Sequence, residues 1–424
     1  MAALSGSRRR VAARGWVAAL AVLAALAGGC TSGGQAPPAS SASSAATVDA
    51  AVRRLLDQHA AAVLHRDQAA FLAGIDPRAQ AYRTRQTAVF ANLAQVPLAA
   101  WSYTLVRTDA FALAPSADGT YRVAAEVRLG YRLTGYDTEP VESTAYLTLS
   151  RRDGHWYIAG DEDGTASGHR GAVQLWDQGP VQVVRGAHSL VLGLGDQAAL
   201  RGYADNADAA VPAVTRVWGS GWPGKVVVEV PATLDQMAAL IGAAADDYRD
   251  IAAVTTGELG ADAVAPADRV IVNPRAFGEL SDFGRQAVLT HETTHVATRL
   301  STTAHTPLWL SEGIADWVAY RASGRTATRL APELTTDVLA GRIPTALPAD
   351  DAFRSTAAGL PQAYEEGWLA CRMIADQWSP DTLTAFYRAV AQGGTMDARL
   401  RAALGLSLSQ FTARWRSYVT QELG

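Results

Sequence analysis

The stretch Val288-Leu-Thr-His291-Glu292-Thr-Thr-His295-Val-Ala decides how this chain is interpreted. It contains the pattern His-Glu-X-X-His, and we expect it to lie on a helix, where residues four apart share one face. His291 and His295 can therefore present two imidazole nitrogens to one metal ion. Glu292 is rotated by about 100° from His291, so it is badly placed as a ligand but well placed to touch a metal-held water. The alternative is two surface histidines on a polar helix.

A second motif, Trp309-Leu-Ser-Glu312-Gly-Ile-Ala-Asp316, offers a third ligand. We expect it on a second helix, which a loop around residues 305–307 allows to fold back onto the first. A catalytic zinc usually has three protein ligands and one open position, so two histidines with Glu312 suit zinc. Asp316 follows Glu312 by one helical turn, and we expect it to accept the free N–H of a ligating imidazole. His305 is the alternative third ligand.

Together the two motifs resemble those of gluzincin metallopeptidases, in particular the bacterial peptidase-MA-like domains. The resemblance extends over roughly residues 181–424. It implies Zn2+ bound by His291, His295 and Glu312, with Glu292 as the general base. The family's carboxylate behind the metal ligands corresponds to Asp316.

Such domains also tend to carry a tyrosine ahead of a Gly-Trp-Leu helix. Tyr364 in Ala363-Tyr364-Glu-Glu-Gly367-Trp-Leu occupies that place, so the resemblance implies that Tyr364 donates to the oxyanion. A tyrosine that only packs against the next helix is the alternative. Metzincins are disfavoured, because no third histidine follows at their spacing and His305 lacks the expected glycine.

The first thirty residues have the composition of an export signal. Four arginines between residues 8 and 14 precede an apolar run over 16–27, which is shorter than the roughly 20 residues of a membrane-spanning helix. The run ends at Leu26-Ala27-Gly28-Gly29-Cys30, which resembles the lipobox of bacterial lipoproteins, although leucine is commoner than Ala27. We expect a signal peptide over 1–29 and a lipid on Cys30. An ordinary secretory signal with an accidental cysteine is the alternative.

Residues 31–47 are mostly Ser, Ala, Gly and Pro without charge, so we expect a flexible tether over 30–47. The lipid would hold the protein on the outside of a bacterial cell membrane. Without the four arginines of the signal peptide, the mature chain has a net charge of about −8, so anionic headgroups would not attract it. The absence of a basic patch argues against nucleic-acid binding. The two cysteines are too few for a disulfide framework, and Cys371 is expected to pack as a small apolar side chain.

Hydrophobic periodicity predicts an α+β fold for the mature chain. Apolar residues recur at helical spacing over 48–72 and 79–93, and they then alternate over 101–107, 121–133, 143–149 and 155–158. Helices followed by antiparallel strands predict a domain over 48–165. Its pattern is similar to that of the cone-shaped nuclear-transport-factor-like domains. We expect it to serve as a spacer or docking domain.

Residues 175–424 are expected to form the metallopeptidase domain, with a small sheet, the active-site helix and a helical C-terminal part. Strand-like or helical patterns precede the metal motif, and everything after residue 281 reads as helix and loop. The expected strands cover 181–184, 189–194, 225–230, 251–256 and 269–273, and the expected helices cover 196–218 and 233–241.

These features predict a membrane-anchored extracytoplasmic zinc metallopeptidase that hydrolyses peptide bonds through zinc-activated water. An endopeptidase is preferred, because no Gly-rich motif for recognising a substrate N-terminus precedes the metal motif. The peptide or protein substrate is expected to pair with an edge strand, either 251–256 or 269–273. One alternative is a non-catalytic lipoprotein that binds partners through its N-terminal domain and holds zinc for structure. Another is a latent peptidase whose cleft the N-terminal domain covers.

Overall fold

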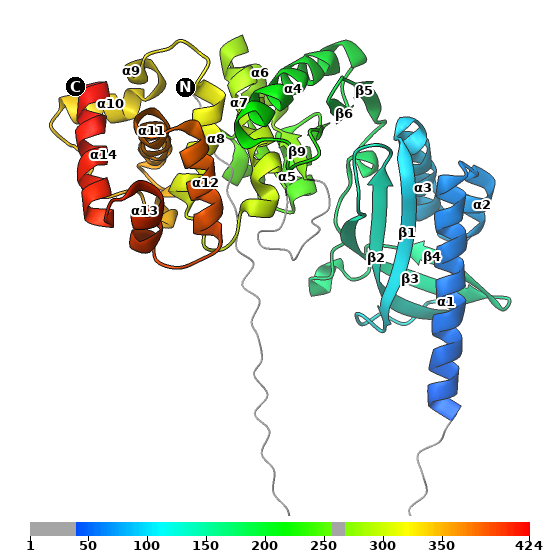
Figure 1. Ribbon diagram of the computed structural model, residues 1–424. Coiled ribbons are helices and arrows are strands. Elements are labelled where there is room, and N and C mark those ends of the chain that lie inside the picture. Colours follow the sequence, from blue (N-terminus) through cyan, green and yellow to red (C-terminus); the bar gives the residue numbers. More distant parts are fainter. Residues whose placement is uncertain (1–39, 257–267) are drawn as a thin grey trace, which may run out of the picture.

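The computed structural model describes residues 40–256 and 268–424. It has an N-terminal antiparallel sheet with helices, followed by a small mixed sheet and a helical C-terminal part (Figure 1). The predicted α+β class is confirmed. The predicted signal peptide, Cys30 and residues 31–39 of the predicted tether lie outside the described residues. Within the described ranges, no helix has the length and apolar character needed to cross a membrane.

The N-terminal part begins with three helices, of which α1 lies along strand β1 of the sheet (Figure 1). The strands follow one another in the order β1-β2-β3-β4, each antiparallel to its neighbour. Inward-facing residues such as Leu56, Trp101 and Leu149 form its core. The elements are α1 (Ser40–Leu64), α2 (Gln68–Ala73), α3 (Gln80–Asn92), β1 (Leu98–Thr108), β2 (Tyr121–Leu133), β3 (Val141–Arg152) and β4 (His155–Gly160).

Two details of this part differ from the sequence-based expectations. Helix α1 begins at Ser40, inside the segment expected as a tether, because Ser-Ala repeats extend a helix that is already nucleated. The helix expected over 48–72 is interrupted at Arg66, whose φ is 57°. Asp67 then starts α2 by accepting a hydrogen bond from the Ala70 amide. The Arg66 guanidinium donates to the carbonyl oxygens of Leu93 and Val96, and these hydrogen bonds offset the cost of the positive φ at Arg66.

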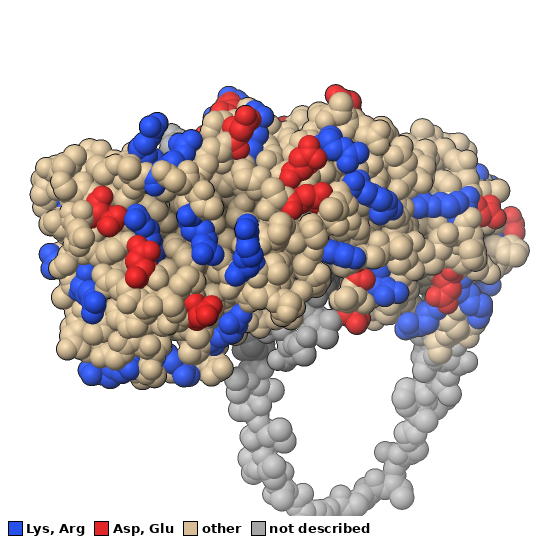
Figure 2. All heavy atoms as spheres, turned by 45° about the horizontal axis from the view of Figure 1, so that its top comes forward, with Lys and Arg blue, Asp and Glu red and all other residues tan. Residues whose placement is uncertain are grey.

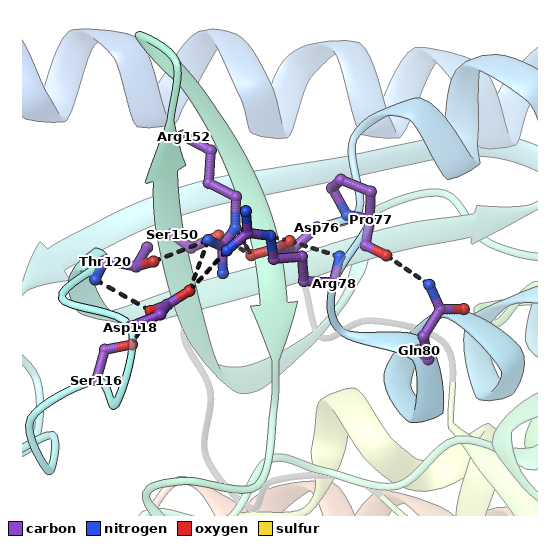
Figure 3. Close-up of polar contacts among 9 residues, drawn as sticks. All are labelled: Asp76, Pro77, Arg78, Gln80, Ser116, Asp118, Thr120, Ser150 and Arg152. Atoms are coloured by element: carbon purple, nitrogen blue, oxygen red, sulfur yellow. Dashed lines mark hydrogen bonds and ion pairs between the residues drawn. The ribbon is translucent and has the colours of Figure 1, made fainter.

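A polar cluster around Asp76 ties the loop between α2 and α3 to the sheet (Figure 3). The buried Asp76 carboxylate accepts hydrogen bonds from Ser150 at 2.5 Å and from the Arg78 amide at 2.8 Å. Arg152 bridges Asp76 at 2.9 Å and Asp118 at 2.9 Å. Every member of the cluster is bonded to another, so the cluster serves to join elements.

The second sheet has the strand order β5-β6-β7-β9-β8. Strands β6, β7 and β9 run parallel, whereas β5 and β8 are antiparallel to their neighbours at the two edges. Its elements are β5 (Gln182–Arg185), β6 (Ser189–Gly193), α4 (Gln197–Trp218), β7 (Val226–Val230), α5 (Leu234–Ile241), β8 (Ala253–Thr255) and β9 (Arg269–Val272), and they match the predicted elements closely.

The second sheet is covered on both faces. Alternate residues such as Val191 and Val228 pack with the helices α4 and α7 (Asp282–Thr298). The residues between them, such as Leu190, Leu192 and Val227, share a core with the N-terminal part. Because successive side chains of a strand point to opposite faces, the N-terminal part lies on the face opposite α7.

The C-terminal part is built from helices around one core. Glycines allow α8 and α11 to cross closely: a Cβ added at Gly313 would lie 2.2 Å from the carbonyl oxygen of Gly367. The helices after α5 are α6 (Pro274–Gly278), α7, α8 (Leu308–Tyr320), α9 (Ala327–Leu330), α10 (Pro332–Leu339), α11 (Leu360–Gln377), α12 (Pro380–Ala391), α13 (Met396–Leu404) and α14 (Leu408–Leu423).

Surface charge is mixed. On the face shown in Figure 2, Lys and Arg side chains are spread over both parts of the molecule and interspersed with Asp and Glu. This face of the described residues therefore carries mixed charge rather than one large patch of a single sign.

Candidate active site

Two helices bring the three expected metal ligands together. Ser281 begins α7 by accepting a hydrogen bond from the Gly284 amide, and α7 then carries His291 and His295 on one face. Helix α8 begins after Pro307 and carries Glu312 opposite the two histidines. The three side chains are buried, with His291 and Glu312 each only 1% exposed. The residues between α7 and α8 therefore act as the predicted loop that folds one motif back onto the other.

The ligand atoms of these residues form a small triangle. The Nε2 atoms of His291 and His295 are 3.0 Å apart, and Oε2 of Glu312 lies 3.2 Å from each. Among the described residues, His291, His295 and Glu312 are the His, Cys, Asp and Glu side chains grouped closely enough to hold a metal ion.

This triangle fits zinc. With bonds of about 2.0–2.1 Å, tetrahedral zinc places its ligand atoms roughly 3.3–3.4 Å apart, close to the 3.0–3.2 Å that separate these three atoms. Two imidazoles with one carboxylate are the donor set of a catalytic zinc that keeps one position open. The residues present therefore fit the metal that the sequence predicts.

Asp316 lies behind the ligands, as predicted. Its Oδ1 is 2.8 Å from Nδ1 of His291, and because a carboxylate can only accept, Nδ1 carries the proton and Nε2 keeps its lone pair for a metal. Burial lowers the pKa of His291, but Asp316 and Glu312 raise it further, so that pKa lies well above its usual value. The site thus stabilises positive charge.

Glu292 is held beside the triangle from the sheet. It is buried, and its Oε2 accepts a hydrogen bond of 2.6 Å from the Thr255 hydroxyl on the edge strand β8. The same hydroxyl lies 3.1 Å from the Glu292 carbonyl oxygen. Thr255 thereby fixes the direction of the carboxylate. No sequence motif indicates this role, because the contact joins a short strand to a residue on a different element.

Tyr364 lies on α11 close to the histidines. Its ring centroid is 6.5 Å from that of His291, and its ring meets Phe353 edge-on at 5.2 Å. Beside Tyr364 and Asp316 there is a cavity of about 400 Å3 between α7, α8 and α11. Its apolar walls include Leu280, Phe283, Leu330 and Trp368.

Two residues considered in the sequence analysis lie outside the triangle. His305 is exposed and lies next to Gly393, so the structure does not bring it to the other ligands. Cys371 is fully buried, with Sγ 3.8 Å from the Leu310 carbonyl oxygen. Burial raises the pKa of the Cys371 thiol well above its usual value, as for a packed apolar side chain. The predicted packing role of Cys371 is therefore confirmed.

Comparison with known proteins agrees with the geometry. The model of the Peptidase MA superfamily matches residues 260–421, which include α7, α8 and α11. No curated protein matches the chain. The match begins downstream of β8, so the N-terminal part and most of the second sheet lie outside it.

Proposed function

We propose that this chain, which carries a zinc peptidase domain of the Peptidase MA superfamily, cleaves internal peptide bonds of proteins outside the cytoplasm, from a lipid anchor on Cys30. The observation that supports the peptidase chemistry is the convergence of His291, His295 and Glu312. Glu292 directly follows His291 on α7. A structural zinc site has no need of a general base, so the buried Glu292 favours catalysis over the non-catalytic alternative.

In this proposal each side chain has one task. Zinc, when bound to the three ligands, supplies Lewis acidity to a water and to the substrate carbonyl. Glu292, held by Thr255, accepts the proton of the attacking water and later delivers it to the departing amine. Tyr364 donates to the developing oxyanion. Asp316 keeps His291 in the tautomer that presents Nε2.

Substrate backbone is proposed to pair with β8. Of the two strands expected as candidates, β9 is excluded because it lies between β7 and β8 and uses its backbone on both sides. β8 is the edge strand and carries Thr255 next to Glu292. An extended peptide added to β8 would therefore run past the general base.

The cavity beside Tyr364 is proposed to accept a large apolar side chain of the substrate. Its size is in the usual range of binding pockets, and its walls are mostly apolar. Burial raises the pKa of Glu365, which lines it, to about 9, so this carboxyl group carries a proton at neutral pH. Glu279 and Glu333 also line the cavity, so an anionic side chain would be repelled there, whereas an aromatic or aliphatic one would pack against the apolar walls.

Hydrolysis of dye-labelled casein tests the peptidase proposal. The purified chain from residue 31 is expected to release dye, and Glu292→Gln is expected to lower kcat by roughly 10²–10⁴-fold while zinc remains bound. Glu142→Gln, an exposed residue of β3, is the matched control and should leave kcat unchanged. Equal rates in wild type and Glu292→Gln would refute catalysis and favour the structural zinc site.

Membrane fractionation tests the anchor. The full chain is expected in the membrane fraction and to incorporate labelled palmitate, whereas Cys30→Ala should lose the label and be released by washing. The support for this proposal is the leader sequence that ends at Cys30. Equal membrane retention without label in both chains would overturn it.

The latent peptidase, with the N-terminal domain over the cleft, finds no support in the arrangement of the elements. The N-terminal part packs on the face of the second sheet opposite α7. A cover over the site would have to lie on the α7 side.

A further inference from the structure

The loop between β2 and β3 of the N-terminal part reaches across to the second sheet. Tyr136 donates from its hydroxyl to the Ser189 carbonyl oxygen at 2.7 Å, on strand β6. Lys225, just before β7, donates to the Gly135 carbonyl oxygen at 2.8 Å. The next residue of the loop, Asp137, reaches β9.

Asp137 forms a bidentate ion pair with Arg269, the first residue of β9. Its two carboxylate oxygens accept hydrogen bonds of 2.8 Å from the two terminal nitrogens of the guanidinium. Oδ2 also accepts from the Leu133 amide at 2.7 Å, which fixes the carboxylate on its own loop. The side chains of Asp137 and Arg269 are 0% and 5% exposed, so solvent does not screen the pair. Glu229 of β7 lies 3.7 Å from the Nε of Arg269.

The backbone of Arg269 connects this ion pair to the general base. Its amide donates to the Thr256 hydroxyl at 3.0 Å, and its carbonyl oxygen accepts from the Thr256 amide at 2.8 Å. The preceding residue, Thr255, holds the Glu292 carboxylate at 2.6 Å. The contacts of Asp137 with Arg269, of Arg269 with Thr256 and of Thr255 with Glu292, linked through the Thr255–Thr256 peptide bond, therefore join the N-terminal domain to Glu292.

We propose that Asp137 is a positioning residue for Glu292: the N-terminal domain fixes Arg269, Arg269 fixes the edge strand β8, and Thr255 on β8 aims the general base. This inference rests on the proposed peptidase function for its catalytic consequence. It assigns the N-terminal domain an internal role in the site, beyond the spacer or docking role expected from the sequence.

The nature of the pair favours positioning over simple stabilisation. Transferring two charges from water into a protein interior costs free energy that their attraction only partly offsets, so a buried pair adds little net stability. By contrast, a bidentate guanidinium–carboxylate pair fixes the distance and the relative orientation of its two side chains. β8 spans only Ala253–Thr255, so its own ladder gives it few bonds to hold its position.

Amide hydrogen exchange tests the claim that Asp137 holds β8 and β9 in place. Asp137→Asn is expected to speed exchange at residues 253–256 and 269–272 at least fivefold, and Arg269→Lys, which keeps the charge but loses the fork, should give a smaller increase. Asp76→Asn, which breaks a buried ion pair elsewhere in the N-terminal part, is the matched control and should leave these amides unchanged. Unchanged exchange in Asp137→Asn, or an equal rise in Asp76→Asn, would overturn the proposal; if Asp137→Asn fails to fold, Arg269→Lys decides.

Casein hydrolysis tests the claim that Asp137 positions Glu292 for catalysis. For folded, zinc-loaded Asp137→Asn we expect kcat to fall roughly tenfold to hundredfold with KM within twofold, because a small displacement of a catalytic group lowers the rate without changing substrate binding. Thr255→Val should do the same, and the double variant should fall no further than the stronger single one. A merely structural role would lower Tm and leave kcat per folded molecule intact.

The two readouts separate the two claims. If wild type and Glu292→Gln hydrolyse casein equally, the proposed function fails, and exchange alone decides whether Asp137 holds β8 and β9. If Glu292→Gln is inactive while Asp137→Asn has normal kcat, the positioning role fails and the proposed function stands.

Discussion

At the scale of single residues, the site depends on which atom of each side chain faces the centre. Asp316 accepts from Nδ1 of His291, and this contact leaves Nε2 as the atom that meets Glu312 and His295. The helical spacing of the two histidines was sufficient to predict their shared face. The direction of Glu292 was not predictable, because Thr255, which sets it, comes from another element.

Asp316→Asn is expected to weaken zinc binding by 10–100-fold, because an amide presents both a donor and an acceptor and no longer enforces the tautomer of His291. Competition with a chromophoric chelator measures the affinity. Asp205→Asn, an exposed residue of α4, is the control. Unchanged affinity in Asp316→Asn would contradict the role of the hydrogen bond.

Tyr364→Phe separates the two roles considered for this residue. As an oxyanion donor, Tyr364 should contribute roughly 10²–10³-fold to kcat, and its loss should leave zinc content and Tm unchanged. If the ring only packs against Phe353 and the neighbouring helix, Phe should preserve kcat. Casein hydrolysis and thermal unfolding, measured on the same preparation, distinguish the two outcomes.

At the scale of elements, the sequence predicted most helices and strands because their apolar residues recur at clear periods. It did not predict the strand order. β9 follows β8 in the chain, but in the sheet β9 lies between β7 and β8. Only this order shows that β8 is the edge. The break at Arg66 was missed because its cause is tertiary: the guanidinium binds carbonyl groups of Leu93 and Val96, far away in the sequence.

Gly313→Ala is expected to disrupt the site through the crossing of α8 and α11. The added Cβ would lie 2.2 Å from a backbone oxygen of Gly367, so the helices must separate, and Glu312, the neighbour of Gly313, must move with α8. We expect a lower Tm and weaker zinc binding. Gly202→Ala in α4 meets no atom within 4 Å and should stabilise by about 0.5–1 kcal/mol. Gly313→Ala with the Tm and zinc affinity of wild type would show that the crossing tolerates a side chain.

At the scale of the whole molecule, the N-terminal part and the peptidase domain share a core across the second sheet. A pattern of alternating apolar residues predicts two such domains but does not show which faces meet. The pair of Asp137 with Arg269 joins residues 132 positions apart, and no local signal indicates it. The part that carries the metal motifs was predictable residue by residue, whereas the role of the N-terminal part required the structure.

The polar cluster of Figure 3 makes the stability of the molecule sensitive to acid. Burial raises the pKa of Asp76, but the hydrogen bonds from Ser150, the Arg78 amide and Arg152 lower it further, so the pKa lies below its ordinary value. A carboxyl group whose pKa is depressed by folding stabilises the fold above its unfolded pKa of about 3.9, and this contribution is lost as the pH falls.

Asp76→Asn should therefore lower Tm clearly at pH 7, and the difference from wild type should shrink as the pH falls towards about 4 and below. Thermal unfolding at a series of pH values measures it. A difference that stays constant over this range would show that the ionisation of Asp76 does not contribute.

The central claim is that His291, His295 and Glu312 bind one catalytic zinc. Metal content by mass spectrometry, on the chain from Thr31 to Gly424 and on its His295→Ala variant, tests it most directly. We predict about one zinc per folded wild-type chain and its loss in the variant. Folded wild type without stoichiometric zinc, or a variant that keeps it, would contradict the account.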